Sequence, residues 1–471
     1  MSINLIKLKD VEGLSNKEIR SFYMNHVNPG MLKYMDLTGF SKVTPVKAEG
    51  MYIYTKDGRN VLDMTCGVGV LGHGHNHPRI IEVRKRFEDE KRPMVWKAFI
   101  SPYLAALSKN LAEISPGDLN YPFICNSGAE AVEGALKMAE KFQGKNKDKI
   151  IAANNAFHGK THATLSVSGS EDTRDYFKLL DGIFSVPYSD YDALEKLILS
   201  RCKSDSKEND VCAVILESMH CNNVEIPPKG YLKKVRKLTE DYGILLILDE
   251  VYCGFGKTGK MFAFEHEEIV PDIFAVSKTM GGGKASIAAY IAREHIFRKA
   301  YGSTQDAMIH TTTYNGFGQE CITAIEAINI LYEENLVENS RVMGEYLLAE
   351  LKKLKEKYPK IIKDVRGNGL LCGIEFYPYM PKITAPLKKM GNFIGDVVDK
   401  FVGGAVMNEL FFGYDIFTFI NPKYGSVLHI EPSLIIKKEE IERAIKALDS
   451  IFSKGLARLT VNLVRRTLSP F

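Results

Sequence analysis

The chain has 471 residues, of which 45% are apolar and 25% are charged, a composition typical of soluble globular proteins. Its 62 basic and 58 acidic residues leave a net charge of only +4, which does not indicate a nucleic-acid-binding protein. No apolar stretch is long enough to predict a membrane span, and residues 1–9 lack the apolar core of a signal peptide. The eight cysteines are scattered without a CxxC pair, which predicts reduced thiols in a cytoplasmic protein.

Residues 1–78 are predicted to join the C-terminal part of the chain in a small domain. They end in the run Gly72-His-Gly-His-Asn-His77-Pro78, whose glycines and proline predict a turn before a helix. The alternating imidazoles of His73, His75 and His77 also allow a metal-site interpretation. We predict no metal, because no acidic ligand or further His/Cys cluster accompanies them.

Residues 79–337 are predicted to form a large α/β domain. Between about residues 100 and 330, short apolar runs alternate with amphipathic stretches, which predicts a mainly parallel sheet. Ligands of such sheets bind beyond the carboxyl ends of the strands. Candidate site residues follow five of these runs, namely Ser127 with Gly128, Phe157 with His158, Glu217, Asp249 and Lys278.

The first of these positions leads from a strand end through a small-residue turn into a helix. Backbone N–H groups at Ser127, Gly128 and Ala129, with the helix dipole behind them, suit a phosphate group. The alternative is an ordinary strand–helix turn in which Ser127 only caps the helix. The ring of Phe157 could lie over a flat cofactor, although a single aromatic residue at a strand end also suits a core position.

Asp249 follows the apolar run 244–248, and Lys278 ends a second apolar run just before the glycines at 281–283. This pair suits a pyridoxal 5'-phosphate (PLP) enzyme. The lysine would hold the cofactor as a Schiff base, and the acid would keep the pyridine nitrogen protonated, so that the ring acts as an electron sink. Residues 310–313 add three threonine hydroxyls before a long helix, where simple helix capping is the other interpretation.

Residues 338–471 are predicted to form a small α+β domain from Lys/Glu-rich helices and two strand-like runs. The basic tail at residues 454–466 spaces its leucines on one helical face. We expect it to pack on the small domain or on a dimer partner, with a membrane or partner helix as the alternative.

In combination, these runs resemble the class III (ornithine/GABA-type) aminotransferases of the fold-type I PLP enzymes, over nearly the whole chain. The matching runs are residues 126–137, 157–160, 249–266, 277–283, 310–314 and 365–370. Residues 26–30, together with 310–313, are most similar to the putrescine (diamine) aminotransferase branch. The resemblance implies a homodimer, each subunit having a large domain around a mostly parallel seven-stranded sheet and a small α+β domain.

The resemblance also implies a role for each matching position. Lys278 would form the internal aldimine with PLP and then move a proton between the substrate carbon and the cofactor. Asp249 would pair with the pyridinium nitrogen, and Phe157 and Val251 would contact the two faces of the ring. The other positions implied to bind the cofactor are His158, Glu217, Tyr252, the phosphate-binding Ser127, Gly128 and Ala129, and Thr312 and Thr313, of which Thr313 would reach in from the neighbouring subunit.

The substrate end departs from the family pattern. Many members carry a Glu five residues after the strand-end Glu and an Arg in a C-terminal Arg-x-x-Pro, where this chain has Asn222 and His429. In the family these two residues form a switch, in which the Glu masks the Arg for amine substrates and frees it for the carboxylate of glutamate. Both residues are changed in this chain, which is consistent because an unpaired buried charge is costly. At the position where the family often has an Arg that binds a second carboxylate, this chain has Lys160, as in the diamine branch.

We therefore predict a PLP-dependent aminotransferase (transaminase) that moves an amino group between a primary (ω-)amine, including a diamine or an alkylamine, and a carbonyl acceptor. A class III racemase/epimerase or aminomutase is the alternative, since an enzyme with one substrate needs no switch between two. A PLP-fold protein kept as a scaffold would be marked by loss of Lys278 or Asp249, and both are present.

Overall fold

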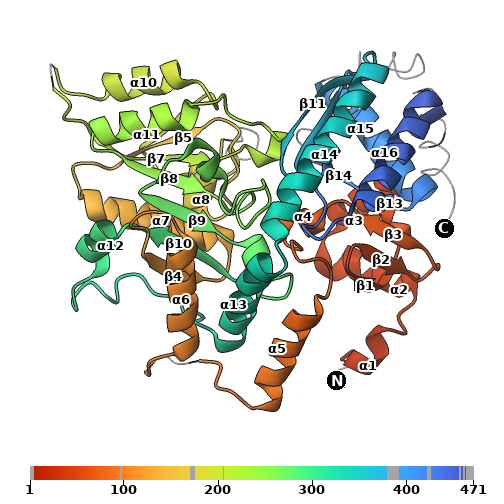
Figure 1. The fold of residues 1–471 in the computed structure, drawn as a ribbon, viewed down its shortest axis with the longest axis horizontal. Coiled ribbons are helices and arrows are strands. Elements are labelled where there is room, and N and C mark those ends of the chain that lie inside the picture. Colours follow the sequence, from red (N-terminus) through yellow and green to blue (C-terminus); the bar gives the residue numbers. More distant parts are fainter. Residues whose placement is uncertain are drawn as a thin grey trace.

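The computed structural model describes residues 5–95, 98–169, 175–204, 206–378, 392–421, 426–455, 458–459 and 462. Its strands form one seven-stranded sheet and two four-stranded sheets. The large sheet and its helices lie on one side of the molecule, and the two small sheets lie on the other with the most C-terminal helices (Figure 1). Strands near the two ends of the chain therefore meet on the same side.

The seven-stranded sheet has the order β4-β10-β9-β8-β7-β5-β6. β10 runs antiparallel to both of its neighbours, and the other pairs are parallel. The mostly parallel seven-stranded sheet expected from the sequence is thus confirmed. The strands are β4 (Tyr121–Cys125), β5 (Lys149–Ala153), β6 (Ile183–Val186), β7 (Val211–Glu217), β8 (Leu245–Asp249), β9 (Ile273–Val276) and β10 (Ala288–Ala292).

The central strands of this sheet are buried along their whole length. Along β8, Leu246 and Leu248 belong to one apolar cluster and Leu245 and Ile247 to another, because successive side chains point to opposite faces. Both faces are covered, which explains why these strands are continuous apolar runs rather than alternating ones.

The helices of this part are α5 (Pro78–Asp89), α6 (Pro102–Ile114), α7 (Gly128–Gln143), α8 (His162–Val167), α10 (Tyr191–Ser200), α11 (Tyr231–Asp241), α12 (Glu294–Tyr301) and α13 (Gly318–Glu333). Short 3-10 turns lie at η3 (Cys221–Asn223), η4 (Ala263–Glu267) and η5 (Lys278–Gly281). Two of these turns, η3 and η5, follow strands of the large sheet and carry predicted site residues.

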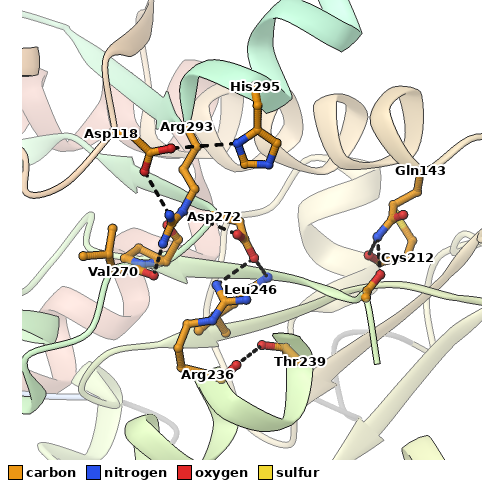
Figure 2. Close-up of polar contacts among 12 residues, drawn as sticks. Asp118, Gln143, Cys212, Arg236, Thr239, Leu246, Val270, Asp272, Arg293 and His295 are labelled. Atoms are coloured by element: carbon orange, nitrogen blue, oxygen red, sulfur yellow. Dashed lines mark hydrogen bonds and ion pairs between the residues drawn. The ribbon is translucent and has the colours of Figure 1, made fainter. Parts of the chain in front are cut away.

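An ion-pair network centred on Asp272 lies at the amino-terminal edge of the large sheet (Figure 2). Its Oδ2 accepts hydrogen bonds from Arg236 Nη1 at 2.7 Å and from the backbone N–H of Leu246 at 2.8 Å. Its Oδ1 lies 3.5 Å from Nε of Arg293. The same arginine contacts Oδ1 of Asp118 through its Nη1 at 2.9 Å. The network links β8, β9 and β10 at the side of the sheet opposite the carboxyl ends of β8 and β9, where Asp249 and Lys278 lie.

One of the two small sheets combines strands from the two ends of the chain, and the other is formed by C-terminal strands alone. One has the order β1 (Pro45–Glu49), β2 (Tyr52–Thr55), β3 (Asn60–Asp63) and β13 (Ile416–Phe417), and the other β11 (Ile362–Asn368), β12 (Leu371–Phe376), β15 (Val427–Ile430) and β14 (Phe419–Ile420). In the first sheet β13 pairs in parallel with β3, so that Ile416 lies opposite Leu62.

The remaining helices and turns are α1 (Leu8–Val11), α2 (Asn16–Phe22), the π-helix η1 (Tyr23–Val27), α3 (Pro29–Thr38), η2 (Phe40–Lys42), α4 (Cys66–Gly69), α14 (Leu336–Lys357), α15 (Asn392–Tyr414) and α16 (Lys438–Ser453). No helix in the described part of the chain is long and apolar enough to cross a membrane. The eight cysteines are free thiols. Most of the basic tail at 454–466 lies outside the described residues.

Candidate active site

A cavity of about 640 Å³ lies where β5, β7, β8 and β9 end. Its walls also include the beginning of α7, Val68 of α4, and Asn421 just after β14. The predicted site residues that line it are Gly128, Ala129, Phe157, His158, Lys160, Glu217, Asn222, Asp249, Val251, Tyr252 and Lys278. The other predicted residues, which do not line it, are Ser127, Thr312, Thr313 and His429.

Asp249 is buried at the end of β8 with a fixed orientation. Its Oδ2 lies 2.7 Å from Nδ1 of His158, and its Oδ1 accepts a hydrogen bond from the backbone N–H of Val251 at 2.9 Å. His158 is itself buried, and its Nε2 has no hydrogen-bond partner within the described residues. The imidazole therefore holds a carboxylate at the cavity wall.

Glu217 holds together the two loops on either side of the cavity. Its Oε1 accepts from the backbone N–H of Phe157 at 2.8 Å, and its Oε2 accepts from the backbone N–H of Cys221 at 2.9 Å. Because both carboxylate oxygens are occupied, this buried acid orients the segments carrying Phe157 and Asn222.

The amino terminus of α7, where the sequence predicts a phosphate site, lies at the cavity. Ser127 caps the helix, since its Oγ accepts from the N–H of Glu130 at 3.2 Å. A Cβ added to Gly128 would lie 2.7 Å from Cγ1 of Val251, so a glycine is needed for the helix to approach the wall. The first N–H groups of a helix lack partners within the helix and attract anions.

Lys278 begins η5 directly after β9, with a positive φ of 49°. Such a conformation costs about 1–3 kcal/mol in a residue other than glycine and is concentrated at functional sites. The Nζ lies 3.7 Å from the centroid of the Tyr252 ring. Burial lowers the pKa of Lys278, and nearby negative groups, including Asp249 and Glu431, oppose this shift. A lowered pKa favours the neutral amine, which is the nucleophile.

Tyr252 connects the cavity with Glu431, a buried acid that was not among the predicted site residues. Its hydroxyl donates a hydrogen bond to Oε2 of Glu431, and Oε1 of Glu431 lies 2.6 Å from Nδ1 of His429. Burial raises the pKa of the Tyr252 hydroxyl well above its ordinary value, and the charge of Glu431 adds to this shift. His429 lies behind Glu431 and stacks on Phe419 at 4.4 Å.

Two amides lie at the part of the cavity where the sequence predicts substrate binding. Nδ2 of Asn421 donates to Oδ1 of Asn222 at 2.9 Å, which joins the loop after β7 to the loop after β14. Lys160 is exposed at the edge of the cavity, and Val68 is half exposed on its wall. Val68 lies in a turn where the four residues 66–69 all have positive φ, a feature that no local pattern had indicated.

Thr312 and Thr313 lie in the loop between α12 and α13. Thr312 accepts a hydrogen bond from Nδ2 of Asn126 at 3.4 Å, which places it beside the start of α7. The loop is anchored by His310, whose ring lies 4.7 Å from that of Phe123. Thr313 is exposed and does not line the cavity of its own chain.

The three histidines before α5 have separate partners. Nε2 of His73 bonds to the carbonyl of Ala327 at 2.8 Å, His75 pairs with Asp63 at 2.9 Å, and His77 faces Glu334. Within the described residues, no group of three or more His, Cys, Asp or Glu side chains could hold a metal ion.

The residues of this cavity fit PLP by the chemistry of their groups. A buried aspartate, a helix amino terminus for a phosphate and a lysine with a lowered pKa line one cavity, which defines a PLP-dependent enzyme. Residues 38–452 match the model of the aminotransferase class-III family. The chain belongs to the class III aminotransferases and is a PLP-dependent enzyme that transfers amino groups.

Solved structures of similar proteins agree with this assignment. A transaminase from the marine bacterium Virgibacillus is 25% identical, with a TM-score of 0.77 over 88% of this chain and 93% of that one. The ornithine aminotransferase of Toxoplasma gondii, with partial occupancy of PLP at its active site, is 25% identical, with a TM-score of 0.77 over 95% and 100%. A thermostable (S)-enantioselective omega-transaminase from Thermomicrobium roseum, 24% identical, shares the fold with a TM-score of 0.80 over 94% and 99%.

Proposed function

We propose that this aminotransferase takes nitrogen from a primary (ω-)amine, a diamine or an alkylamine, and transfers it to a carbonyl acceptor. PLP, when bound, supplies an electron-withdrawing ring that stabilises negative charge on the carbon next to the amine nitrogen. Lys278 would attach the cofactor and carry the proton at that carbon, and Asp249 would hold a proton on the pyridine nitrogen. Gly128 and Ala129 would bind the phosphate through their backbone N–H groups.

The observation that carries this proposal is the amide pair at the substrate end of the cavity. Asn222 is bonded to Asn421, and His429 is bonded to Glu431 behind the wall. The described lining contains no arginine, so it forms no guanidinium clamp for the carboxylates of glutamate. Amide oxygens can accept hydrogen bonds from the distal end of an amine without an ion pair. The similarity of residues 26–30 and 310–313 to the diamine branch also supports the proposal.

Lys160 is the group proposed to contact the acceptor. It is exposed at the edge of the cavity, and the two acids of the wall, Glu217 and Asp249, are already occupied by hydrogen bonds. A carboxylate on the carbonyl substrate would therefore find one accessible cation there besides the lysine that binds the cofactor.

A homodimer is proposed as the working form of the enzyme. Thr313 is exposed in its own chain, and its neighbours Met308 and Tyr314 expose 77% and 56% of their surfaces. Phe99 and Ile100, just before α6, expose 75% and 90%. Large apolar side chains at such exposure favour burial against another chain. A partner subunit there would bring its own Thr313 to the phosphate.

The test is the absorbance of the PLP-loaded protein during titration with amines and no acceptor. The panel is putrescine, cadaverine, ornithine, 4-aminobutyrate, glutamate, alanine and a long-chain alkylamine, with Lys278→Ala as the control. Diamines or alkylamines, but not glutamate, are expected to convert the lysine-bound cofactor to its aminated form. Conversion by glutamate would contradict the substrate class, and continued turnover of one amine without an acceptor would indicate a racemase or aminomutase instead.

A further inference from the structure

The ring of Tyr252 is the surface against which the amine of Lys278 rests. The Nζ lies 3.7 Å from the ring centroid, close enough for the π-face to attract an ammonium group. The amine has no hydrogen bond or ion pair to the residues that the structure describes. When PLP does not hold this lysine, the position of its amine therefore depends on where the ring lies.

The ring is held at its hydroxyl and along one edge. Its hydroxyl donates to Oε2 of Glu431, whose other oxygen is 2.6 Å from Nδ1 of His429. A Cβ added to Gly69 would lie 3.6 Å from Cζ of Tyr252 and 3.3 Å from Cδ of Lys278. The backbone of Gly69 therefore packs against both the ring and the stem of the lysine.

The carboxylate of Glu431 lies in a place where charge is costly. Its side chain is 0% exposed, and burial of a carboxylate is unfavourable unless its oxygens receive hydrogen bonds. Here the donors are Tyr252 and His429, and Nζ of Lys257 also donates to the backbone carbonyls of Glu431 and Pro432, each at 2.9 Å. An apolar residue would fill this space without the free-energy cost of burying a charge. The acid therefore serves to orient the hydroxyl of Tyr252.

We propose that Glu431 and His429 are positioning residues, which hold the hydroxyl of Tyr252 so that its ring stays beneath the amine of Lys278. The inference rests on the proposed function of Lys278 as the residue that attaches PLP. In that attachment the amine nitrogen bonds to the aldehyde carbon of PLP, the carbonyl oxygen leaves as water, and the nitrogen gives up its two protons. An amine held in one position reacts with the aldehyde carbon faster than a mobile amine, because it is already oriented for the attack.

The rate of PLP attachment to the cofactor-free full-length protein tests this proposal, followed by absorbance. Tyr252→Phe and Glu431→Met each remove the hydrogen bond to a charged acceptor, and each is expected to slow attachment about tenfold. The double variant Tyr252→Phe/Glu431→Met is expected to be no slower than either single variant, because both changes break one interaction. His429→Leu should slow attachment in the same direction.

Two further variants separate positioning from charge and from general damage. Glu431→Gln keeps an oxygen for Tyr252, and its amide can donate to the other tautomer of His429, so it should restore a rate close to that of the wild type. Tyr358→Phe removes a comparable hydroxyl, which donates to Asp449 Oδ1 at 2.7 Å outside the cavity, and should leave the rate unchanged.

Equal rates in the wild type and Tyr252→Phe would overturn the proposal, and so would a Glu431→Gln variant as slow as Glu431→Met. Tyr252→Phe removes one oxygen atom, so it decides the question even if Glu431→Met does not fold. Lys278→Ala addresses the proposed function separately. If Lys278→Ala gained the same lysine-type absorbance as the wild type, the function assigned to Lys278 would fail, whatever the Tyr252 series showed.

Discussion

Replacement of Glu217 by glutamine is expected to destabilise the two loops beside the cavity that this side chain holds. The carboxylate receives two backbone hydrogen bonds, from Phe157 and Cys221, at 2.8 and 2.9 Å. Glutamine has one oxygen, so one N–H would face the amide nitrogen of the new side chain, donor against donor. A hydrogen bond to a charged group contributes roughly 1.5–3 kcal/mol, and the stranded buried N–H adds to the loss.

We therefore expect Glu217→Gln to lower the free energy of unfolding by roughly 2–4 kcal/mol. The measurement is urea unfolding of the cofactor-free protein at one fixed protein concentration, since dimerisation would shift the midpoint. The dissociation constant of PLP should rise as well, because Phe157 lines the cavity through the loop that Glu217 holds.

Glu113→Gln is the matched control. Glu113 pairs with Lys109 on the surface of α6, with both side chains 71% exposed, and its neutralisation should leave the stability nearly unchanged, because water screens such a pair. If the two variants unfolded at the same urea concentration, the two hydrogen bonds of Glu217 would not be holding these loops, and the reasoning would be refuted.

Three other substitutions have expected outcomes. Burial lowers the pKa of His73 from 6.5 to about 4, so that as the pH falls the unfolded chain gains a proton before the folded one does. The free energy of unfolding should therefore fall by about 3 kcal/mol as the pH is lowered from 6.5 to 4. His73→Gln should reduce this pH dependence, measured by urea unfolding at several pH values. Asp272→Ala leaves Arg236 without its carboxylate and should cost about 3 kcal/mol of stability, with activity per folded molecule unchanged; a drop in specific activity would contradict this. Gly128→Ala places a methyl group 2.7 Å from Val251 and should weaken PLP binding about tenfold, and adding Val251→Ala should recover it in a cofactor titration.

The part of the site that lies at strand ends could be predicted from the chain alone. Asp249 and Lys278 each follow a continuous apolar run, and parallel strands bring the ends of such runs to one edge. The positions of the pair, of Phe157 and of Gly128 therefore follow from local pattern plus one rule of topology. The same reasoning yielded the mostly parallel sheet.

The rest of the cavity depends on contacts between distant segments. Asn421 and Glu431 enter through the small sheets, whose pairing of Leu62 with Ile416 leaves no trace in local periodicity. His429 is predicted as a substrate residue because it occupies the position of the family's arginine. In the structure it lies behind Glu431 and against Phe419, a position that depends on side-chain packing between distant segments. Sequence patterns specify elements well and packing between elements poorly, since each contact combines two unrelated stretches of chain.

The shared sheet of β3 and β13 has a consequence for the order in which the enzyme is made. Val68 of the cavity wall leaves the ribosome before Lys278, whereas Asn421 and Glu431, the partners of Asn222 and Tyr252, emerge only after every strand of the large sheet. A nascent chain can assemble the large sheet first, as domains commonly fold during synthesis. Its cofactor pocket nevertheless stays open on one side until β14 and β15 have been made, so we expect tight capture of PLP only after the segments carrying Asn421 and Glu431 have joined the small sheets.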